Sequence, residues 1–202
     1  MKSGLTQAQR KQRTRAELVE TARRIFLAHG FHGASLDEVA EAAGYSKGAV
    51  YSNFAGKAEL FLAVLDAHFA ERARSYAAVA LDGRDLDESY RAVARFRLEA
   101  EEREPDWEPL LLEFWTYAAR RHDLREAVSE RRERFLDVIA DLIGELASRH
   151  GVTYTIPVRE VARGSAALLR GMVVERMLDP AASSTGVLAE MHAAYMKGLT
   201  KQ

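Results

Sequence analysis

The stretch SLDEVAEAAGYSKGAVYSNFAGKAELF, from Ser35 to Phe61, decides the fold. Ser35 and Glu38 form a capping-box pattern, which marks a helix N-terminus, and apolar residues at helical spacing follow until Gly44. Ser46 then predicts the cap of a second, very short helix. A short helix, a turn that contains glycine and another short helix together predict a helix-turn-helix motif.

The second short helix, Lys47 to about Phe54, has two distinct faces. Val50 and Phe54 are four residues apart and predict the face that packs inward. In the interior of a helix Gly48 costs about 1 kcal/mol relative to alanine, so we interpret it as a point where the backbone approaches DNA closely. The outward face carries groups that suit a major groove, namely a cation, a glycine, an aromatic hydroxyl and a small hydroxyl: Lys47, Gly48, Tyr51 and Ser52.

The region before this motif is basic. Residues 1–57 contain nine Lys or Arg and five Asp or Glu, a net charge of +4, whereas the remainder of the chain carries −5. A basic head on an acidic body suits a protein of which one end contacts phosphate. Thr14 and Glu17 predict the start of a first helix that ends at Gly30. The tail before it is either a solubilising leader or an arm that contacts phosphates or the minor groove through Arg10, Lys11, Arg13 and Arg15.

Helical periodicity continues through the rest of the chain, with Gly and Pro between the segments. We expect an all-α fold of nine helices, with no two-residue alternation typical of strands. We place a three-helix DNA-binding head with its basic arm at residues 1–57 and a helical effector-binding and dimerisation domain at 58–202. Asp85, Pro157 and Ser183 or Ser184 mark starts of later helices.

The stretch Ser35–Phe61 closely resembles the DNA-binding region of the TetR family of bacterial one-component transcriptional regulators. Ser46, Lys47, Gly48, Ala49, Tyr51 and Phe54 match the family's recognition helix in order, and Lys57 matches a lysine that grips phosphate. Two positions depart from the family pattern: Ala49 stands where threonine is frequent, and Asn53 where His or Tyr is frequent. The resemblance implies these DNA-binding residues: Ser35, Ser46, Lys47, Gly48, Ala49, Tyr51, Ser52, Asn53 and Lys57.

Three of these assignments have simpler alternatives. If they do not contact DNA, Lys57 is a solvated cation and Ser35 is only a helix cap. The three-helix head is then a structural subdomain. We expect Tyr51 to contact a phosphate or a thymine methyl group.

The resemblance also implies a function. We expect a cytoplasmic homodimer that binds a palindromic double-stranded DNA operator. Repression is the family default, and we expect a small-molecule effector to release the protein from DNA. No cofactor and no metal is expected. The competing hypothesis is a helical ligand-binding protein whose head binds a protein partner. Strong salt dependence of DNA binding separates the two.

The segment Pro157–Leu178 is apolar on more than one face, which predicts two packing partners. Gly164, Ser165, Ala166 and Gly171 provide small surfaces that permit close approach of another helix. We therefore expect this helix and the last one to pair with their copies across a twofold axis; a large monomeric core is the alternative. The predicted dimer residues are Val161, Leu168, Met172, Val187, Met191 and Tyr195.

Aromatic residues with few polar neighbours predict the effector pocket, although the same pattern is also typical of an ordinary core. Arg170, among apolar neighbours, binds either an acid group of the effector or an internal carboxylate, and the internal ion pair is the stronger expectation. The candidate pocket residues are Trp107, Phe114, Trp115, Tyr117 and Arg121, with Phe96 and Met172 facing them.

Several classes of protein are disfavoured. The chain contains no cysteine, which removes disulfides and thiolate chemistry, and no apolar run long enough to span a membrane. Its polar, basic N-terminus does not fit a signal peptide. Phosphate-loop, zinc-protease and serine-hydrolase motifs are absent from the sequence, so we expect no enzymatic activity. The acidic run from Glu99 to Glu108 fits a solvated helix face better than a metal site.

Overall fold

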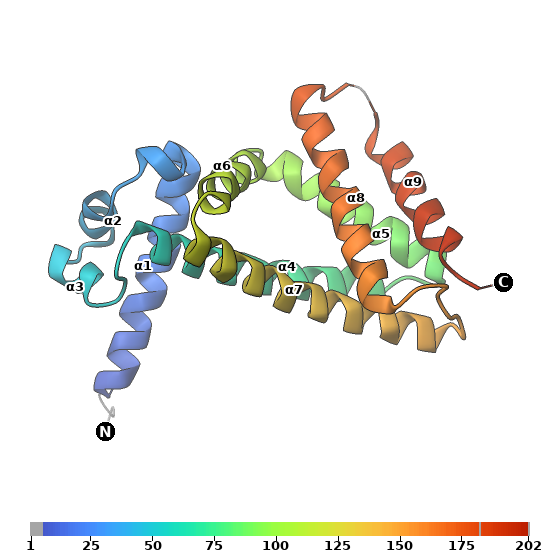
Figure 1. Cartoon of the computed structure of the whole chain (residues 1–202), viewed down its shortest axis with the longest axis horizontal. Helices are drawn as coiled ribbons and strands as arrows, with labels where there is room; N and C mark the ends of the chain where they lie inside the picture. Colours follow the sequence, from blue (N-terminus) through green and yellow to red (C-terminus); the bar gives the residue numbers. More distant parts are fainter. Residues whose placement is uncertain (1–5, 182, 202) are drawn as a thin grey trace. The chain divides into compact units, whose positions relative to one another are not determined.

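The computed structural model describes residues 6–181 and 183–201. Within these residues the chain forms nine helices, as expected, and the extended pairing among them is one isolated bridge between Tyr154 and Thr200. Figure 1 shows the helices in chain order. They are α1 (Gln7–Gly33), α2 (Leu36–Ala43), α3 (Lys47–Tyr51), α4 (Lys57–Leu81), α5 (Leu86–Arg103), α6 (Trp107–Ala119), α7 (His122–Arg149), α8 (Val158–Leu178) and α9 (Thr185–Gly198).

Local capping chemistry starts four of these helices where the sequence predicts it. The side chains of Ser35, Ser46, Asp85 and Ser184 each accept a hydrogen bond from the backbone N–H three residues later. Each bond satisfies a donor that lacks a partner within the helix. Pro157 stands immediately before α8 and makes no side-chain cap.

The predicted start of α1 at Thr14 is wrong. The helix begins about two turns earlier, with Thr6 and Gln9 forming a reciprocal capping box. Thr14 lies inside the helix, where its hydroxyl donates to Tyr45 Oη at 3.4 Å. The predicted end at Gly30 corresponds to a break in the helix, because Gly30 has a φ of 71° and one further turn follows it.

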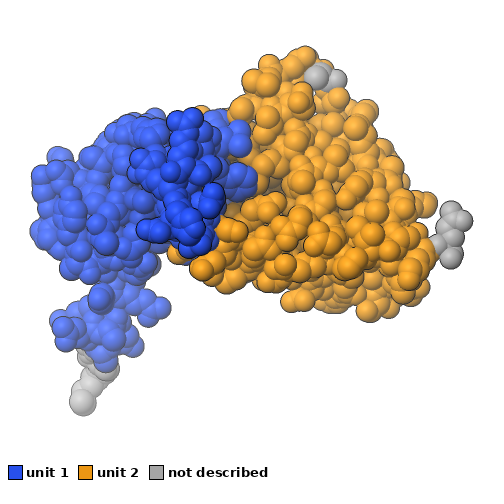
Figure 2. All heavy atoms as spheres, in the orientation of Figure 1, with its two compact units in different colours: residues 1–68, 109–128 blue, residues 69–108, 129–202 orange. Residues whose placement is uncertain are grey.

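The chain divides into two compact units, coloured separately in Figure 2: residues 1–68 with 109–128, and residues 69–108 with 129–202. This division differs from the predicted boundary at residue 57, because most of α6 belongs to the first unit. Aromatic packing explains the difference. The ring of Phe114 on α6 lies 4.1 Å from that of Phe61 and 4.9 Å from that of Phe31.

In the second unit α5, α8 and α9 pack against one another (Figure 1). Their contact buries an apolar cluster that includes Leu98, Leu169, Val173 and Leu188. A second cluster joins Tyr76, Ile139 and Ile143 to Val161 and Met196. Both clusters follow the helical spacing of apolar residues that the sequence shows.

Across the described ranges, none of the helices combines the length and the apolar character that crossing a membrane requires.

Candidate functional site

The exposed face of α3 is built by the two short helices and the turn between them. Gly44 ends α2 with φ 71° and ψ 26°, a left-handed conformation that glycine adopts without strain. Val50 and Phe54 are fully buried, as predicted, whereas Tyr51 is 56% exposed. The helix is thus anchored on one face and presents the other to solvent.

The predicted DNA-binding residues lie on α3, at its two ends, and at the starts of α2 and α4. Ser35, Ser46, Lys47, Gly48, Tyr51 and Ser52 are exposed, while Ala49, Asn53 and Lys57 are half-buried. Several already have partners within the head. Lys47 Nζ donates to Asp37 Oδ2, Ser52 Oγ donates to the carbonyl of Ala49, and Asn53 Nδ2 donates to the same carbonyl at 2.8 Å.

Lys57 has a structural role that the sequence did not reveal. Its Nζ donates to the carbonyls of His32 and Ala34 at 3.0 and 2.8 Å and lies 5.0 Å from the ring centre of Phe31. These carbonyls follow the break at Gly30, so the ammonium group holds the end of α1 against the start of α4. Two of its three N–H donors have protein acceptors.

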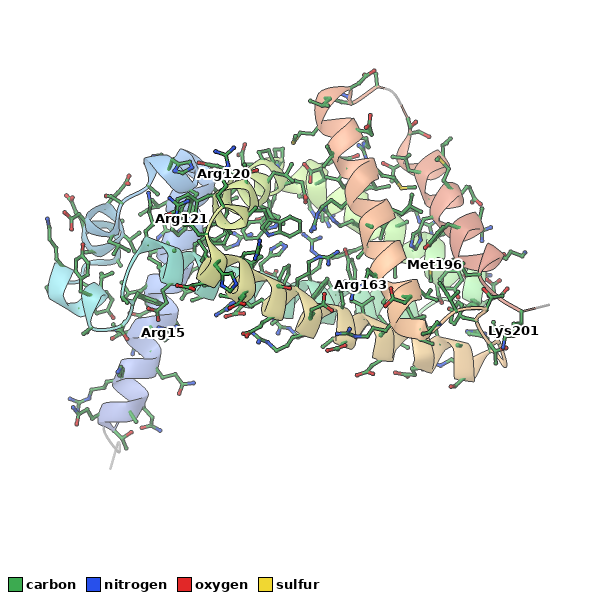
Figure 3. The ribbon with its side chains drawn as sticks, in the orientation of Figure 1. Arg15, Arg120, Arg121, Arg163, Met196 and Lys201 are labelled. Atoms are coloured by element: carbon green, nitrogen blue, oxygen red, sulfur yellow. The ribbon has the colours of Figure 1, made fainter. Side chains whose placement is uncertain are left out.

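The predicted basic arm is largely helical. Arg10, Lys11, Arg13 and Arg15 lie on α1 rather than on an extended segment, and Lys2 lies outside the described residues. Arg13 pairs with Glu17 at 2.7 Å. Arg15, labelled in Figure 3, donates to the Asn53 carbonyl at 2.7 Å, and its guanidinium lies 4.2 Å from the ring centre of Phe54. Arg15 therefore supports the end of α3.

Tyr45 in the turn is a further residue of the head that sequence reasoning missed. Its hydroxyl donates to Glu17 of α1. Hydrogen bonds from Tyr45 and Arg13 lower the pKa of the Glu17 carboxyl. This contact ties the turn to α1, and because the partners are 28 positions apart, no local pattern indicates it.

The predicted effector residues are divided between the two units. Phe114 packs in the aromatic cluster of the first unit, where Tyr117 contacts Phe31 and Arg121 lies 3.7 Å from the Tyr117 ring centre. Figure 3 labels Arg121 and its neighbour Arg120. Trp115 also belongs to this unit, whereas Phe96, Trp107 and Met172 belong to the second unit, where Trp107 and Met172 are buried core residues.

An internal cavity of about 80 Å³ lies instead in the second unit. Helices α4, α5, α7, α8 and α9 all contribute to its wall. Its lining combines aliphatic side chains with the hydroxyls of two tyrosines and one serine, two guanidiniums and an imidazole. Met196 is labelled in Figure 3. The lining residues are Tyr76, Ala80, Tyr90, Val93, Arg97, Phe135, Ile139, Leu142, Ile143, Leu146, Ser165, Ala166, Leu169, Arg170, His192 and Met196.

The internal ion pair expected for Arg170 is confirmed. Glu108, fully buried, accepts from Arg170 Nε at 2.8 Å and from Arg97 Nη2 at 2.5 Å. Arg97 also lies 3.5 Å from Glu101. Burial lowers the pKa of Arg170, Glu108 opposes this effect, and Arg97 reinforces it. Two guanidiniums thus share one buried carboxylate beside the cavity.

His192 occupies another part of the cavity wall. Its Nδ1 lies 3.1 Å from the carbonyl of Tyr90, and its Nε2 lies 2.8 Å from Ser165 Oγ. A carbonyl only accepts, so Nδ1 carries the proton and the serine hydroxyl donates to Nε2. Burial lowers the pKa of His192 to about 4. The imidazole is therefore neutral at neutral pH.

Some predicted dimer residues are core residues of the single chain. Val161 and Met172 are buried in the core of the second unit. Gly164 does permit close helix approach, but its neighbour is Tyr195 of the same chain. Leu168 is half-buried, whereas Val187 and Met191 are 54% and 52% exposed.

Comparison with known proteins identifies the family. The model for bacterial regulatory proteins of the tetR family matches residues 18–64, and the model for the C-terminal part of BetI-type transcriptional repressors matches residues 86–201. The chain belongs to the TetR family of bacterial regulatory proteins. As a TetR-family protein it is a transcriptional regulator with a DNA-binding helix-turn-helix, not an enzyme.

Curated relatives of this TetR-family chain match about a quarter of its length. The transcriptional activator FasR of Mycolicibacterium smegmatis is 44% identical over 54 residues, 27% of this chain and 25% of the relative. The transcriptional repressor AcnR of Corynebacterium efficiens is 45% identical over 51 residues, 25% of this chain and 27% of the relative. The matches thus span about a quarter of each relative, and the two act with opposite sign on transcription.

Solved structures share the fold of this TetR-family chain over nine tenths of its length or more. A TetR-family regulator from Mesorhizobium loti has a TM-score of 0.73 at 24% identity, with 94% of this chain and 96% of that chain covered. A regulator from Saccharomonospora viridis in complex with choline has a TM-score of 0.71 at 18% identity, covering 95% and 100%. FadR from Bacillus subtilis in complex with stearoyl-CoA has a TM-score of 0.69 at 13% identity, covering 90% and 96%.

Proposed function

We propose that this TetR-family protein binds a palindromic operator as a homodimer, represses transcription, and is released from DNA by a small-molecule effector. The observation that carries the proposal is the two-sided α3, with Val50 and Phe54 buried and Tyr51 exposed. A helix anchored in this way offers its polar face to a major groove. Repression is proposed because the matched C-terminal family is described as a repressor family.

The DNA contacts we propose come from α3 and its flanks. Lys47 and the half-buried Lys57 contribute positive charge, Gly48 permits close backbone approach, and Tyr51 reaches a phosphate or a thymine methyl group. Their structural partners support this proposal, because Arg15 and Lys57 hold the ends of the segment in place. The remaining proposed contacts are Ser35, Ser46, Ala49, Ser52 and Asn53.

For the dimer we propose a revised face on α8 and α9. Leu178 is 76% exposed, and three exposed or half-buried residues precede it at helical spacing: Ala167, Gly171 and Val174. On α9, Val187 and Met191 extend the apolar face. Exposed apolar stripes on two adjacent helices are typical of a surface that a second copy covers.

For the effector we propose the cavity of the second unit. It is enclosed by several helices and combines apolar walls with a few polar groups, as ligand sites do. The ligands of the Saccharomonospora viridis and Bacillus subtilis structures support a ligand-binding role for this fold. The effector candidates Phe114, Trp115 and Tyr117 of α6, by contrast, belong to the first unit.

A salt-titrated gel shift with the double-stranded DNA that flanks the protein's own gene tests DNA binding. We expect binding that weakens steeply as salt rises, because phosphate contacts release counterions. Tyr51→Ala should weaken binding, and Tyr51→Phe separates the roles of the hydroxyl and the ring. Wild-type affinity of Tyr51→Ala at fixed salt would contradict the assignment of Tyr51. Salt-insensitive, weak binding by the wild type would favour a head that binds a protein partner.

A further inference from the structure

The charged side chains that line the cavity of the second unit are all positive. Two guanidiniums, from Arg97 and Arg170, line it, and among the described residues of its wall there is no acidic side chain. The acids that compensate the arginines lie behind the wall. Glu108 is fully buried, and Glu101 contacts Arg97 without lining the cavity. A molecule in the cavity therefore meets positive groups first.

The two arginines share an acid behind the wall, because both guanidiniums donate to the Glu108 carboxylate. Burial raises the pKa of Glu101, and Arg97 opposes this effect. Burial and Arg97 both act against the charged form of Arg170 by lowering its pKa. An anion in front of the two arginines would relieve this repulsion and desolvation.

Three other polar residues of the wall, Tyr90, Ser165 and His192, have hydrogen-bond partners. Tyr90 shares a hydrogen bond with Tyr154, and the imidazole of His192 bridges Ser165 and the Tyr90 carbonyl. Neutral His192 adds no charge. The remaining wall is apolar and combines aromatic rings with aliphatic side chains, mainly Ile139, Leu142, Ile143, Leu146 and Leu169. The lining thus has one charged end and an apolar remainder.

We propose that the cavity takes a small organic anion, a carboxylate with an apolar chain, whose acid group pairs with Arg97 and Arg170. This inference rests on the proposed effector site and adds the chemical class of its ligand. Guanidiniums bind carboxylates through parallel N–H···O bonds, and exclusion from water strengthens such bonds. The aliphatic wall would cover the chain.

The main rival is a quaternary ammonium ligand. Tyr76, Tyr90 and Phe135 provide aromatic rings that such cations favour. Binding there would place a cation in a cavity with two guanidiniums and no facing carboxylate, which like-charge repulsion opposes. The two classes predict opposite responses to changes in the charge of the wall.

Isothermal titration and thermal shift of the full-length protein with matched probes test the proposal. The carboxylates are butanoate, hexanoate and octanoate; the neutral and cationic counterparts are the alcohols and the alkyltrimethylammonium ions of equal chain length, together with choline. We expect at least one carboxylate to bind about tenfold more tightly than its alcohol and its ammonium counterpart. Failure of every carboxylate, or stronger binding of an ammonium probe, overturns the proposal.

Charge variants give a second, signed readout. Arg170→Gln should weaken carboxylate binding about tenfold and leave alcohol binding unchanged, whereas Glu101→Gln should strengthen carboxylate binding. Arg163→Gln is the matched control, because Arg163 is on the same helix and pairs with Glu133 at 2.9 Å rather than lining the cavity (Figure 3). Should Arg170→Gln not fold, Glu101→Gln alone decides: weaker carboxylate binding in that variant contradicts the proposal.

Gel shifts with DNA distinguish a failure of the anion inference from a failure of the proposed function. If the wild type shifts its flanking DNA but binds no carboxylate, the anion inference fails and the proposed DNA-binding function stands. If it binds a carboxylate through Arg170 but shifts no DNA, the cavity assignment stands and the proposed function fails. A carboxylate that binds and also lowers the fraction of shifted DNA supports both.

Discussion

Lys47 donates to Asp37 of α2 in the free protein, and a DNA phosphate would compete for the same ammonium group. The pair is exposed, with 67% and 51% of the two side chains accessible. Exposed ion pairs contribute little to stability, so Asp37 matters more for its charge near DNA than for the fold. Lys47 therefore has a partner in the free protein and a proposed partner in DNA, and the two compete.

Asp37→Asn should raise the affinity for operator DNA by up to about fivefold, because it removes the negative charge that pairs with Lys47. Lys47→Ala should lower affinity and reduce the slope of log affinity against log salt by about 1. Gel shifts over a salt series measure both. If Lys47→Ala weakens binding while Asp37→Asn has no effect, competition by Asp37 is excluded.

Residue faces on α3 could be predicted from spacing alone, since Val50 and Phe54 follow a local helical period. Partners distant in sequence could not. Lys57 bonds to carbonyls 23 and 25 positions away, and Arg15 to a carbonyl 38 positions away. Such pairs depend on how helices pack, which a single sequence does not encode as a short pattern.

At the scale of the element, two glycines of the motif have opposite reasons to be glycine. Gly44 has a φ of 71°, whereas Gly48 lies inside α3 with ordinary backbone angles. A Cβ at Gly44 would meet no atom within 4 Å, and one at Gly48 would meet only Ser46 Oγ at 3.9 Å. Steric crowding therefore explains neither residue.

Substitution by alanine should separate the two. Gly44→Ala should lower the free energy of unfolding by about 1 kcal/mol through backbone strain. Gly48→Ala should raise it by up to about 1 kcal/mol, yet weaken DNA binding, if the backbone approaches DNA at that point. Urea unfolding and gel shifts on the same preparations measure both quantities. Undiminished DNA binding by Gly48→Ala would leave Gly48 without a role at the operator.

Capping patterns predicted helix starts well where the cap decides the boundary, as at Ser35 and Asp85. The same pattern misled at Thr14. There the preceding polar residues continue as an exposed helix, held by the box at Thr6 and by the Arg13–Glu17 pair. A capping-box pattern inside a helix resembles one at its start, and the pattern that does start this helix, at Thr6 and Gln9, lies further upstream.

At the scale of the whole molecule, the effector cavity shows what sequence could not supply. Aromatic content singled out α6, but which helix faces enclose a void depends on packing among five helices. Arg170 was the informative residue, because a cation among apolar neighbours requires a partner. For the dimer, the apolar excess of α8 was predicted, yet Val161 and Met172 turned out to face inward.

Stability should depend on pH through His192. Its pKa is lowered from 6.5 to about 4, so the unfolded chain binds a proton more readily than the folded one between these values. The stabilisation is present above pH 6.5 and is lost as pH falls toward 4, by about 3 kcal/mol. Urea unfolding from pH 7 to 4.5 should show a steeper decline for the wild type than for His192→Gln. Parallel pH profiles would contradict this account.

The dimer should depend on exposed apolar residues of α8 and α9. Leu178→Glu combined with Met191→Arg should yield the mass of one chain in sedimentation equilibrium at micromolar concentration and weaken operator binding. Val138→Arg is the control, because Val138 is a comparably exposed apolar residue on α7, at 50%. A wild type that sediments as a monomer, or a dimeric double variant, would remove the proposed face.

The break at Gly30 has a partner on α6. Glu113 accepts from the backbone N–H groups of Phe31 and His32, both at 2.9 Å, and a Cβ at Gly30 would lie 2.8 Å from Glu113 Oε2. One carboxylate therefore shields two neighbouring amides. Their exchange with deuterium reports how often α6 separates from the end of α1, and Glu113→Ala would expose both. These two amides form a built-in reporter of motion in the first unit that needs neither DNA nor effector.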